Sequence, residues 1–157
     1  MTKPPQTNPG FNAAGRRKAR HYALQALYQW YMTAYSLNEI ESQFLTDYDF
    51  SVVDREYFHD LVHGVPAALG DIETAFAPFL IERGIDELDP IERAVLRLGS
   101  YELLKRIDIP YKVVINEAVS LAKKFGAEDG HKYINGVLDK LARDVRKIEI
   151  DAQKKSG

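Results

Sequence analysis

The sequence of 157 residues contains no cysteine and one tryptophan. Without cysteine the chain has no disulfide, thiolate nucleophile or cysteine zinc ligand. No apolar run approaches the roughly 18 residues that a membrane span requires, and the polar, proline-containing first residues lack the apolar core of a signal peptide. These absences are typical of a reducing compartment, so we expect a cytoplasmic protein with no membrane partner.

The sequence also lacks the period-two alternation of half-buried strands. Apolar residues instead recur at helical spacing along most of the chain, which predicts an all-α fold. The expected helices span about 16–34, a short segment from Asn38, a segment capped by Asp54, 88–106, a segment after Pro110 and a last helix capped by Asp129. Pro66 should break the third pattern near 64–66 before it resumes to about Leu80, and Gly126 should end the fifth helix in the left-handed conformation.

The chain reads as one helical domain over 14–147 between two flexible segments. Residues 1–13 are rich in proline and glycine and predict a flexible arm, and residues 148–157 predict a flexible tail. At this length a single domain buries a sizeable core, so no metal or disulfide is needed for stability.

Acidic residues are absent from the first 38 positions, which carry five cations. Residues 39–102 carry four cations against fifteen acids, a net charge of −11, whereas the whole chain has a net charge of only −2. Cations at a helix N-terminus oppose the helix dipole, so their position favours an external anion that offsets the repulsion. A basic, disordered tail is the alternative interpretation.

The cations lie in the stretch GRRKARHYALQALYQW, residues 15–30, as Arg16, Arg17, Lys18 and Arg20. At 100° per residue, one flank of this helix carries Arg17, His21, Leu24 and Tyr28. Guanidinium groups bind phosphates and a tyrosine ring stacks on an unpaired base, so this flank predicts binding of single-stranded nucleic acid. Tyr28 is equally compatible with a half-buried core aromatic.

Several segments partly match known metal-binding or catalytic motifs but lack a required residue. His59 and His63 are one helical turn apart, as in zinc proteases, but Asp60 is shorter than the general-base glutamate and no third histidine follows at a suitable spacing. The segment from Asp47 lacks the glycine and glutamate of a calcium loop. Glu102, on the inward side of 88–106, predicts a structural role. We therefore expect no catalytic residue, no metal and no cofactor.

Three segments resemble the NusB family of bacterial transcription antitermination factors: RRKARHYALQALYQW, IERAVLRLGSYELLKR and IPYKVVINEAVSLAKKFGAEDGHKYINGVLDKLAR. The resemblance covers roughly residues 16–145. It implies two small three-helix bundles packed into one helical domain, with a non-enzymatic role. It also implies three partners: boxA RNA of ribosomal operons, NusE, which is also a small-subunit ribosomal protein, and the RNA polymerase antitermination complex.

The resemblance also assigns roles to individual residues. RNA contact is implied for Arg16, Arg17, Lys18, Arg20, Tyr28, Glu92, Arg97, Lys132 and Tyr133, and partner contact for Asp129 and Tyr133. The lysine at position 18 departs from the family's usual arginine and loses the bidentate fork. The acidic segment 39–102 is a reasonable docking surface for a basic ribosomal protein, or a solvated acidic face. The alternative function is a NusB-like RNA-binding or self-associating module accessory to rRNA modification or ribosome assembly, with a possible homodimer.

Overall fold

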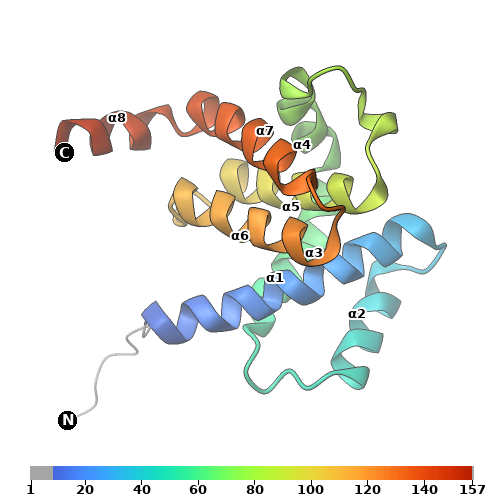
Figure 1. Ribbon diagram of the computed structural model, residues 1–157. Helices are drawn as coiled ribbons and strands as arrows, with labels where there is room; N and C mark the ends of the chain where they lie inside the picture. The colour runs from blue at the N-terminus through green and yellow to red at the C-terminus, as the bar shows by residue number, and fades with distance from the viewer. Residues whose placement is uncertain (1–8, 157) are drawn as a thin grey trace, which may run out of the picture. The chain divides into compact units, whose positions relative to one another are not determined.

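The computed structural model describes residues 9–156, which form α-helices and two short 3-10 helices without any β-strand (Figure 1). The predicted all-α fold is therefore confirmed. The chain divides into two compact units, residues 1–64 and 65–157. Residues 1–8 of the expected arm lie outside the described residues, whereas residues 9–13 belong to the first helix.

The first unit is built from three helices: α1 (Pro9–Met32), α2 (Leu37–Asp47) and α3 (Arg55–Ala67), whose last residues belong to the second unit. α1 starts well before the expected position near 16, and the predicted stripe of Ala19, Ala23, Ala26 and Leu27 is buried. An aromatic cluster joins the three helices, because the Tyr22 ring stacks on Phe50 at 5.1 Å and Phe44 contacts Phe58 at 6.1 Å between centroids. This cluster fixes the face of α1 that packs inward.

Local capping sets the starts of α2 and α3. Ser36 and Glu39 form a capping box, in which Glu39 N–H donates to Ser36 Oγ at 3.2 Å and Ser36 N–H donates to Glu39 Oε1 at 3.3 Å. Asp54 accepts a hydrogen bond from Tyr57 N–H at 3.0 Å, as the sequence predicts. Pro66 lies inside α3 and the break comes later than expected, at Ala68, before α4 (Leu69–Phe76).

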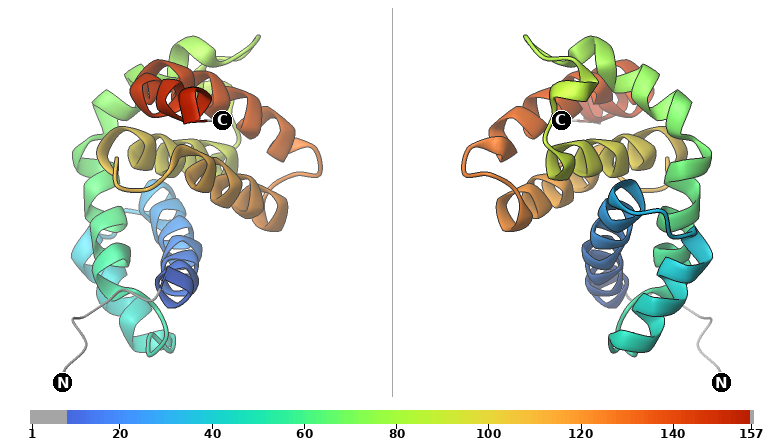
Figure 2. Two further views of the ribbon diagram at one scale, coloured as in Figure 1. Left: turned by 90° about the vertical axis from the view of Figure 1, so that its left-hand side faces the viewer. Right: turned by 90° about the vertical axis from the view of Figure 1, so that its right-hand side faces the viewer.

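The second unit is built around α5 (Pro90–Lys105), α6 (Tyr111–Phe125) and α7 (Gly130–Val145), which lie side by side in Figures 1 and 2. α5 is the central helix, as predicted, with most of its side chains buried. Gly99 permits its close approach to α7, because a Cβ there would lie 2.9 Å from Leu138 Cδ1. α4 and two 3-10 helices, Ala77–Phe79 and Ile85–Glu87, precede this three-helix core.

Two predicted helix ends differ in detail from the structure. Gly126 ends α6 with φ −95° and ψ −177°, so the predicted left-handed conformation is wrong. Glycine is nevertheless required there, because a Cβ would lie 2.7 Å from the Ala122 carbonyl oxygen. Asp129 occupies the N-cap position of α7, but its side chain makes no capping hydrogen bond.

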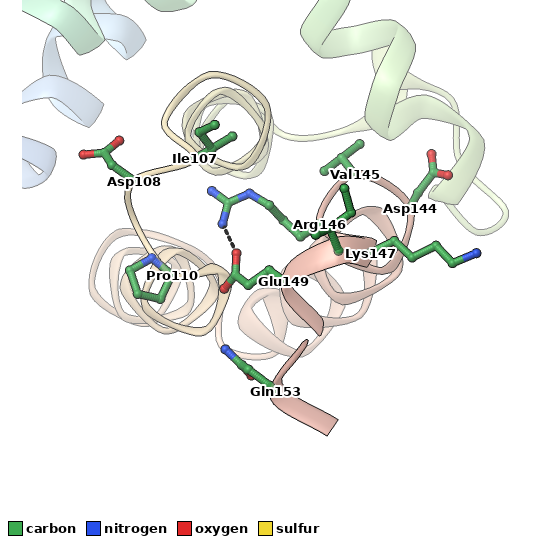
Figure 3. A pocket seen from close by; sticks show the side chains of 10 residues that line it. Ile107, Asp108, Pro110, Asp144, Val145, Arg146, Lys147, Glu149 and Gln153 are labelled. Carbon is green, nitrogen blue, oxygen red and sulfur yellow. Dashed lines mark hydrogen bonds and ion pairs between the residues drawn. The ribbon is translucent and has the colours of Figure 1, made fainter. Parts of the chain in front are cut away.

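The segment 148–157, expected to be a flexible tail, is helical up to Ser156 as α8 (Lys147–Ser156). Arg146, just before α8, is 4% exposed and donates hydrogen bonds of 2.8–3.1 Å to four carbonyl oxygens, those of Glu102, Leu103, Arg106 and Ile109. Arg146 also pairs with Glu149 Oε1 at 2.6 Å, beside a cavity of about 720 Å³ (Figure 3). One side chain therefore satisfies carbonyl groups at and after the C-terminus of α5.

Candidate nucleic-acid interface

The predicted cations all lie on α1 but differ in exposure. Because α1 begins at Pro9, they lie inside the helix, and their predicted position at its N-terminus is wrong. Arg17 and Lys18 are exposed, Arg16 is half-buried, and Arg20 is only 3% exposed. This division follows from helical geometry, since Ala19 and Ala23 set the inward face and Arg20 lies at its edge. The surface cations of this stretch are therefore Arg17 and Lys18, with Arg16 beside them.

Arg16 is held by the start of α3. Its Nε lies 3.7 Å from Asp54 Oδ2, and its guanidinium carbon lies 4.8 Å from the centre of the Tyr57 ring. The Asp54 backbone N–H also donates to Gly15 O at 3.1 Å, which ties the second turn of α1 to the start of α3. Arg16 is thus positioned by packing, and Asp54 offsets part of its charge.

Arg20 is buried and contacts the Tyr57 ring inside the first unit. Its guanidinium carbon lies 5.3 Å from the Tyr57 ring centre, on the same ring that Arg16 contacts. A buried guanidinium over an aromatic face is a favourable cation–π arrangement. The structure therefore places Arg20 among the groups that join α1 to α3, although the sequence groups it with the RNA-contacting cations.

Lys18 on α1 interacts electrostatically with Asp49, which lies in the turn after α2. The Ser51 backbone N–H donates to Asp49 Oδ1 at 2.9 Å, and this bond, the Ser51 hydroxyl and the Lys18 charge together hold the pKa of Asp49 below its usual value. Asp49 is consequently ionised at neutral pH. It lowers the local positive potential around Lys18 without burying the ammonium group.

Two tyrosines of the first unit are candidates for stacking on a base. Tyr28 on α1 is half-buried, a position compatible with packing in the core and with contact to a base. The sequence analysis did not single out Tyr48, which is 43% exposed with its ring 5.0 Å from that of Tyr22. This pair depends on the packing of α1 with the end of α2, so no local sequence pattern marks it.

In the second unit the structure brings Glu92 and Tyr133 together through Arg83. Arg83 Nη1 donates to Glu92 Oε1 at 3.0 Å, and its guanidinium lies 4.3 Å from the Tyr133 ring centre. The Tyr133 hydroxyl accepts a hydrogen bond from Ile81 N–H at 3.0 Å. Glu92 is 6% exposed, so this predicted site residue is the buried anchor of the cluster. Arg83 is the member that the sequence analysis missed.

Arg97 lies in a different ion-pair group on α5. Its Nε and Nη2 both lie 2.9 Å from Glu73 Oε2, and Arg93 Nε is 3.5 Å from the same oxygen. Arg97 is 5% exposed, so burial and pairing hold its guanidinium against α4. A carboxylate shared by two arginines is a strong, charge-assisted arrangement. The geometry thus gives Arg97 a part in joining α4 to α5.

Asp129 and Lys132 are the most accessible predicted residues of this unit. They lie at the start of α7, with 85% and 76% of their side chains exposed and 3.9 Å between the ammonium nitrogen and Asp129 Oδ1. Gly130 packs beside the cluster, since a Cβ there would lie 3.4 Å from Glu92 Oε2. The start of α7 therefore presents two exposed charges next to the Arg83, Glu92 and Tyr133 cluster.

The acidic segment 39–102 is less negative as a surface than its composition suggests. At least six of its carboxylates have basic partners inside their own unit: Glu41 with His59 and His63, Asp54 with Arg16, Asp71 with Lys105, Glu73 with Arg97, Asp86 with Arg93, and Glu92 with Arg83. Internal pairing reduces the long-range field that these groups present to a partner.

No helix among residues 9–156 is both long and apolar enough to cross a membrane.

These features define an all-α protein with a cationic and aromatic helix face and a charged helix start as its candidate interfaces. A model of the NusB family matches residues 17–143. The chain belongs to the NusB family.

Curated relatives carry the name transcription antitermination protein NusB. The protein from Pseudomonas fluorescens is 56% identical over 153 residues, which cover 98% of this chain and 92% of that protein. The protein from Saccharophagus degradans is 57% identical over 143 residues, which cover 91% of this chain and 95% of that protein.

Two solved structures agree with this assignment. T. maritima NusB matches with a TM-score of 0.74 and 29% identity, over 96% of this chain and 99% of that one. A structure of antitermination factors NusB and NusE in complex with dsRNA matches with a TM-score of 0.69 and 28% identity, over 82% of this chain and 96% of that one.

Proposed function

We propose that this chain is a non-enzymatic, cytoplasmic transcription antitermination factor that binds boxA RNA of ribosomal operons together with NusE. The relatives that share more than half of its residues carry the antitermination name, and a related solved complex contains both NusE and RNA. The observation that carries the proposal is the exposed pair Arg17 and Lys18 on α1, next to the positioned Arg16. Exposed cations on one helix are suited to phosphate contact.

Individual residues take different roles in this proposal. Arg17 and Lys18 contact phosphates, Arg16 does so while held by Asp54, and Tyr28 contacts a base. Arg20, Glu92 and Arg97 are buried, so they shape the surface around them and contact RNA only after a local rearrangement. The exposed Asp129 and Lys132, with Tyr133, form the NusE- and RNA-facing surface of the second unit.

The test is a titration of labelled RNA with the full chain, followed by fluorescence anisotropy. A boxA-like single strand, a scrambled strand of equal length and a duplex are compared, because the related complex contains dsRNA. The proposal predicts preference for the boxA-like sequence and a strong decrease of affinity with salt. Equal, salt-independent affinity for the three RNAs would refute it.

Self-association is a second candidate property, favoured by two exposed isoleucines. Ile107 and Ile148 are 77% and 88% exposed, and both line the cavity beside Arg146. Exposed apolar side chains that line a hollow are typical of association surfaces. Light scattering of the protein with and without RNA tests for a homodimer, and a constant monomer mass at high concentration rejects it.

A further inference from the structure

A histidine pair that the RNA-binding face does not use meets a carboxylate in the first unit. His59 and His63 lie one turn apart on α3, and their ring centroids are 4.3 Å apart. Glu41, from α2, places Oε2 at 2.7 Å from His59 Nδ1 and Oε1 at 2.8 Å from His63 Nε2. The third side chain that the sequence pattern lacked is thus supplied by another helix.

We propose that Glu41, His59 and His63 form a binding site for a divalent transition-metal ion of the zinc class. The ligand atoms of all three side chains lie within 4.8 Å of one another. Two imidazole nitrogens and one carboxylate oxygen are a donor set that zinc takes in proteins, with water in the fourth position of the tetrahedron. The proposal is independent of RNA binding.

The side chains must adjust to accept the ion, because ligand atoms that are now up to 4.8 Å apart have to reach tetrahedral spacing. Metal–ligand bonds of about 2.0–2.1 Å in a tetrahedron separate neighbouring ligand atoms by about 3.3 Å. The present hydrogen-bonded separations are 2.7 and 2.8 Å, so each imidazole moves away from Glu41 by about half an ångström. The His59 side chain is 62% exposed, which leaves room for this movement.

The electrostatics also favour a cation. Glu41 is shielded from solvent, with 15% of its side chain exposed. Burial raises its pKa, but the hydrogen bonds from His63 and His59 outweigh that effect, so the pKa of Glu41 lies below its usual value and the carboxylate is ionised. To ligate the ion, each imidazole presents the lone pair of the nitrogen that now faces Glu41, and its ring proton is then on the other nitrogen.

Access from solvent is provided by a shallow hollow lined by Glu41, His59, Leu45, Arg55 and Glu56. Because Glu41 and His59 both border this hollow, an ion bound to them lies at its edge. Bound metal would connect α2 with α3, and it would therefore stabilise the first unit by binding the folded state only.

The experiment uses the full chain without an affinity tag, stripped of metal with EDTA and then dialysed. Titration with zinc chloride in a calorimeter should give one saturable site, and cobalt chloride should give the visible absorption of a tetrahedral ion. His59→Gln, His63→Gln and Glu41→Gln should each weaken binding by at least about tenfold, a loss that even outer-shell partners produce. His131→Gln is the matched control, because it removes a histidine outside the cluster.

Stability provides a second readout. Zinc at about ten times its dissociation constant should raise the melting temperature of the wild type by roughly 3–6 °C, and should leave the His59→Gln protein unchanged. Circular dichroism verifies that His59→Gln, at a largely exposed position, is folded. Absence of a saturable site in the wild type, or equal metal affinity in His59→Gln, would overturn the proposal.

Discussion

Replacing Arg17 and Lys18 together by alanine tests the phosphate contacts most selectively. Both side chains are exposed, whereas Arg16 is half-buried beside Asp54 and Tyr57, and Arg20 is buried. Each phosphate contact on a single strand contributes about 0.7 to the slope of log affinity against log salt, so the double variant should lose about 1.4. Between 50 and 200 mM salt, that difference makes the variant's affinity decrease about sevenfold less than the wild type's.

The assay is anisotropy of a labelled boxA-like strand at four or more salt concentrations, with melting curves of each protein. Lys112→Ala with Arg143→Ala removes the same charge from exposed positions of the second unit and is the control. Arg20→Ala provides the opposite case, because loss of its contact with Tyr57 should lower the melting temperature. An unchanged salt slope in the Arg17 and Lys18 variant, or an equal change in the control, would refute the reasoning.

Two further substitutions separate binding from stability. Tyr28→Ala should cost about 1–3 kcal/mol of RNA affinity if the half-buried ring stacks on a base; a lower melting temperature with unchanged affinity would instead assign Tyr28 to the core. Arg146→Met should destabilise the second unit by about 3–5 kcal/mol, because four carbonyls and Glu149 lose their buried partner. Urea unfolding followed by circular dichroism measures this loss, and a stable Arg146→Met protein would show that water replaces the guanidinium.

The sequence predicted the helices before α8 because each of them has a strong apolar period or a capping residue. Asp54 caps α3 and α5 is the buried central helix, as expected. The C-terminal helix α8 was missed because it has little apolar periodicity of its own. Arg146 links its start to the end of α5, through contacts between residues about 40 positions apart.

The sequence predicted which residues belong to the candidate site, but not which of their side chains are exposed. The four cations of α1 are adjacent in sequence, yet one is buried, because the packing of α1 on Tyr57 decides which of them reaches solvent. Glu92 and Arg97 likewise have partners, Arg83 and Glu73, that are distant along the chain. Glu41 lies 18 positions before His59, on another helix, so no sequence motif pairs them.

Binding of RNA by the protein alone and in a mixture with NusE tests the central proposal most directly. If RNA contacts from this chain and from NusE form one composite surface, a boxA-like strand should bind more tightly to the mixture than to either protein, and RNA should strengthen the protein pair by the same factor. Equal RNA affinity with and without NusE would contradict this proposal.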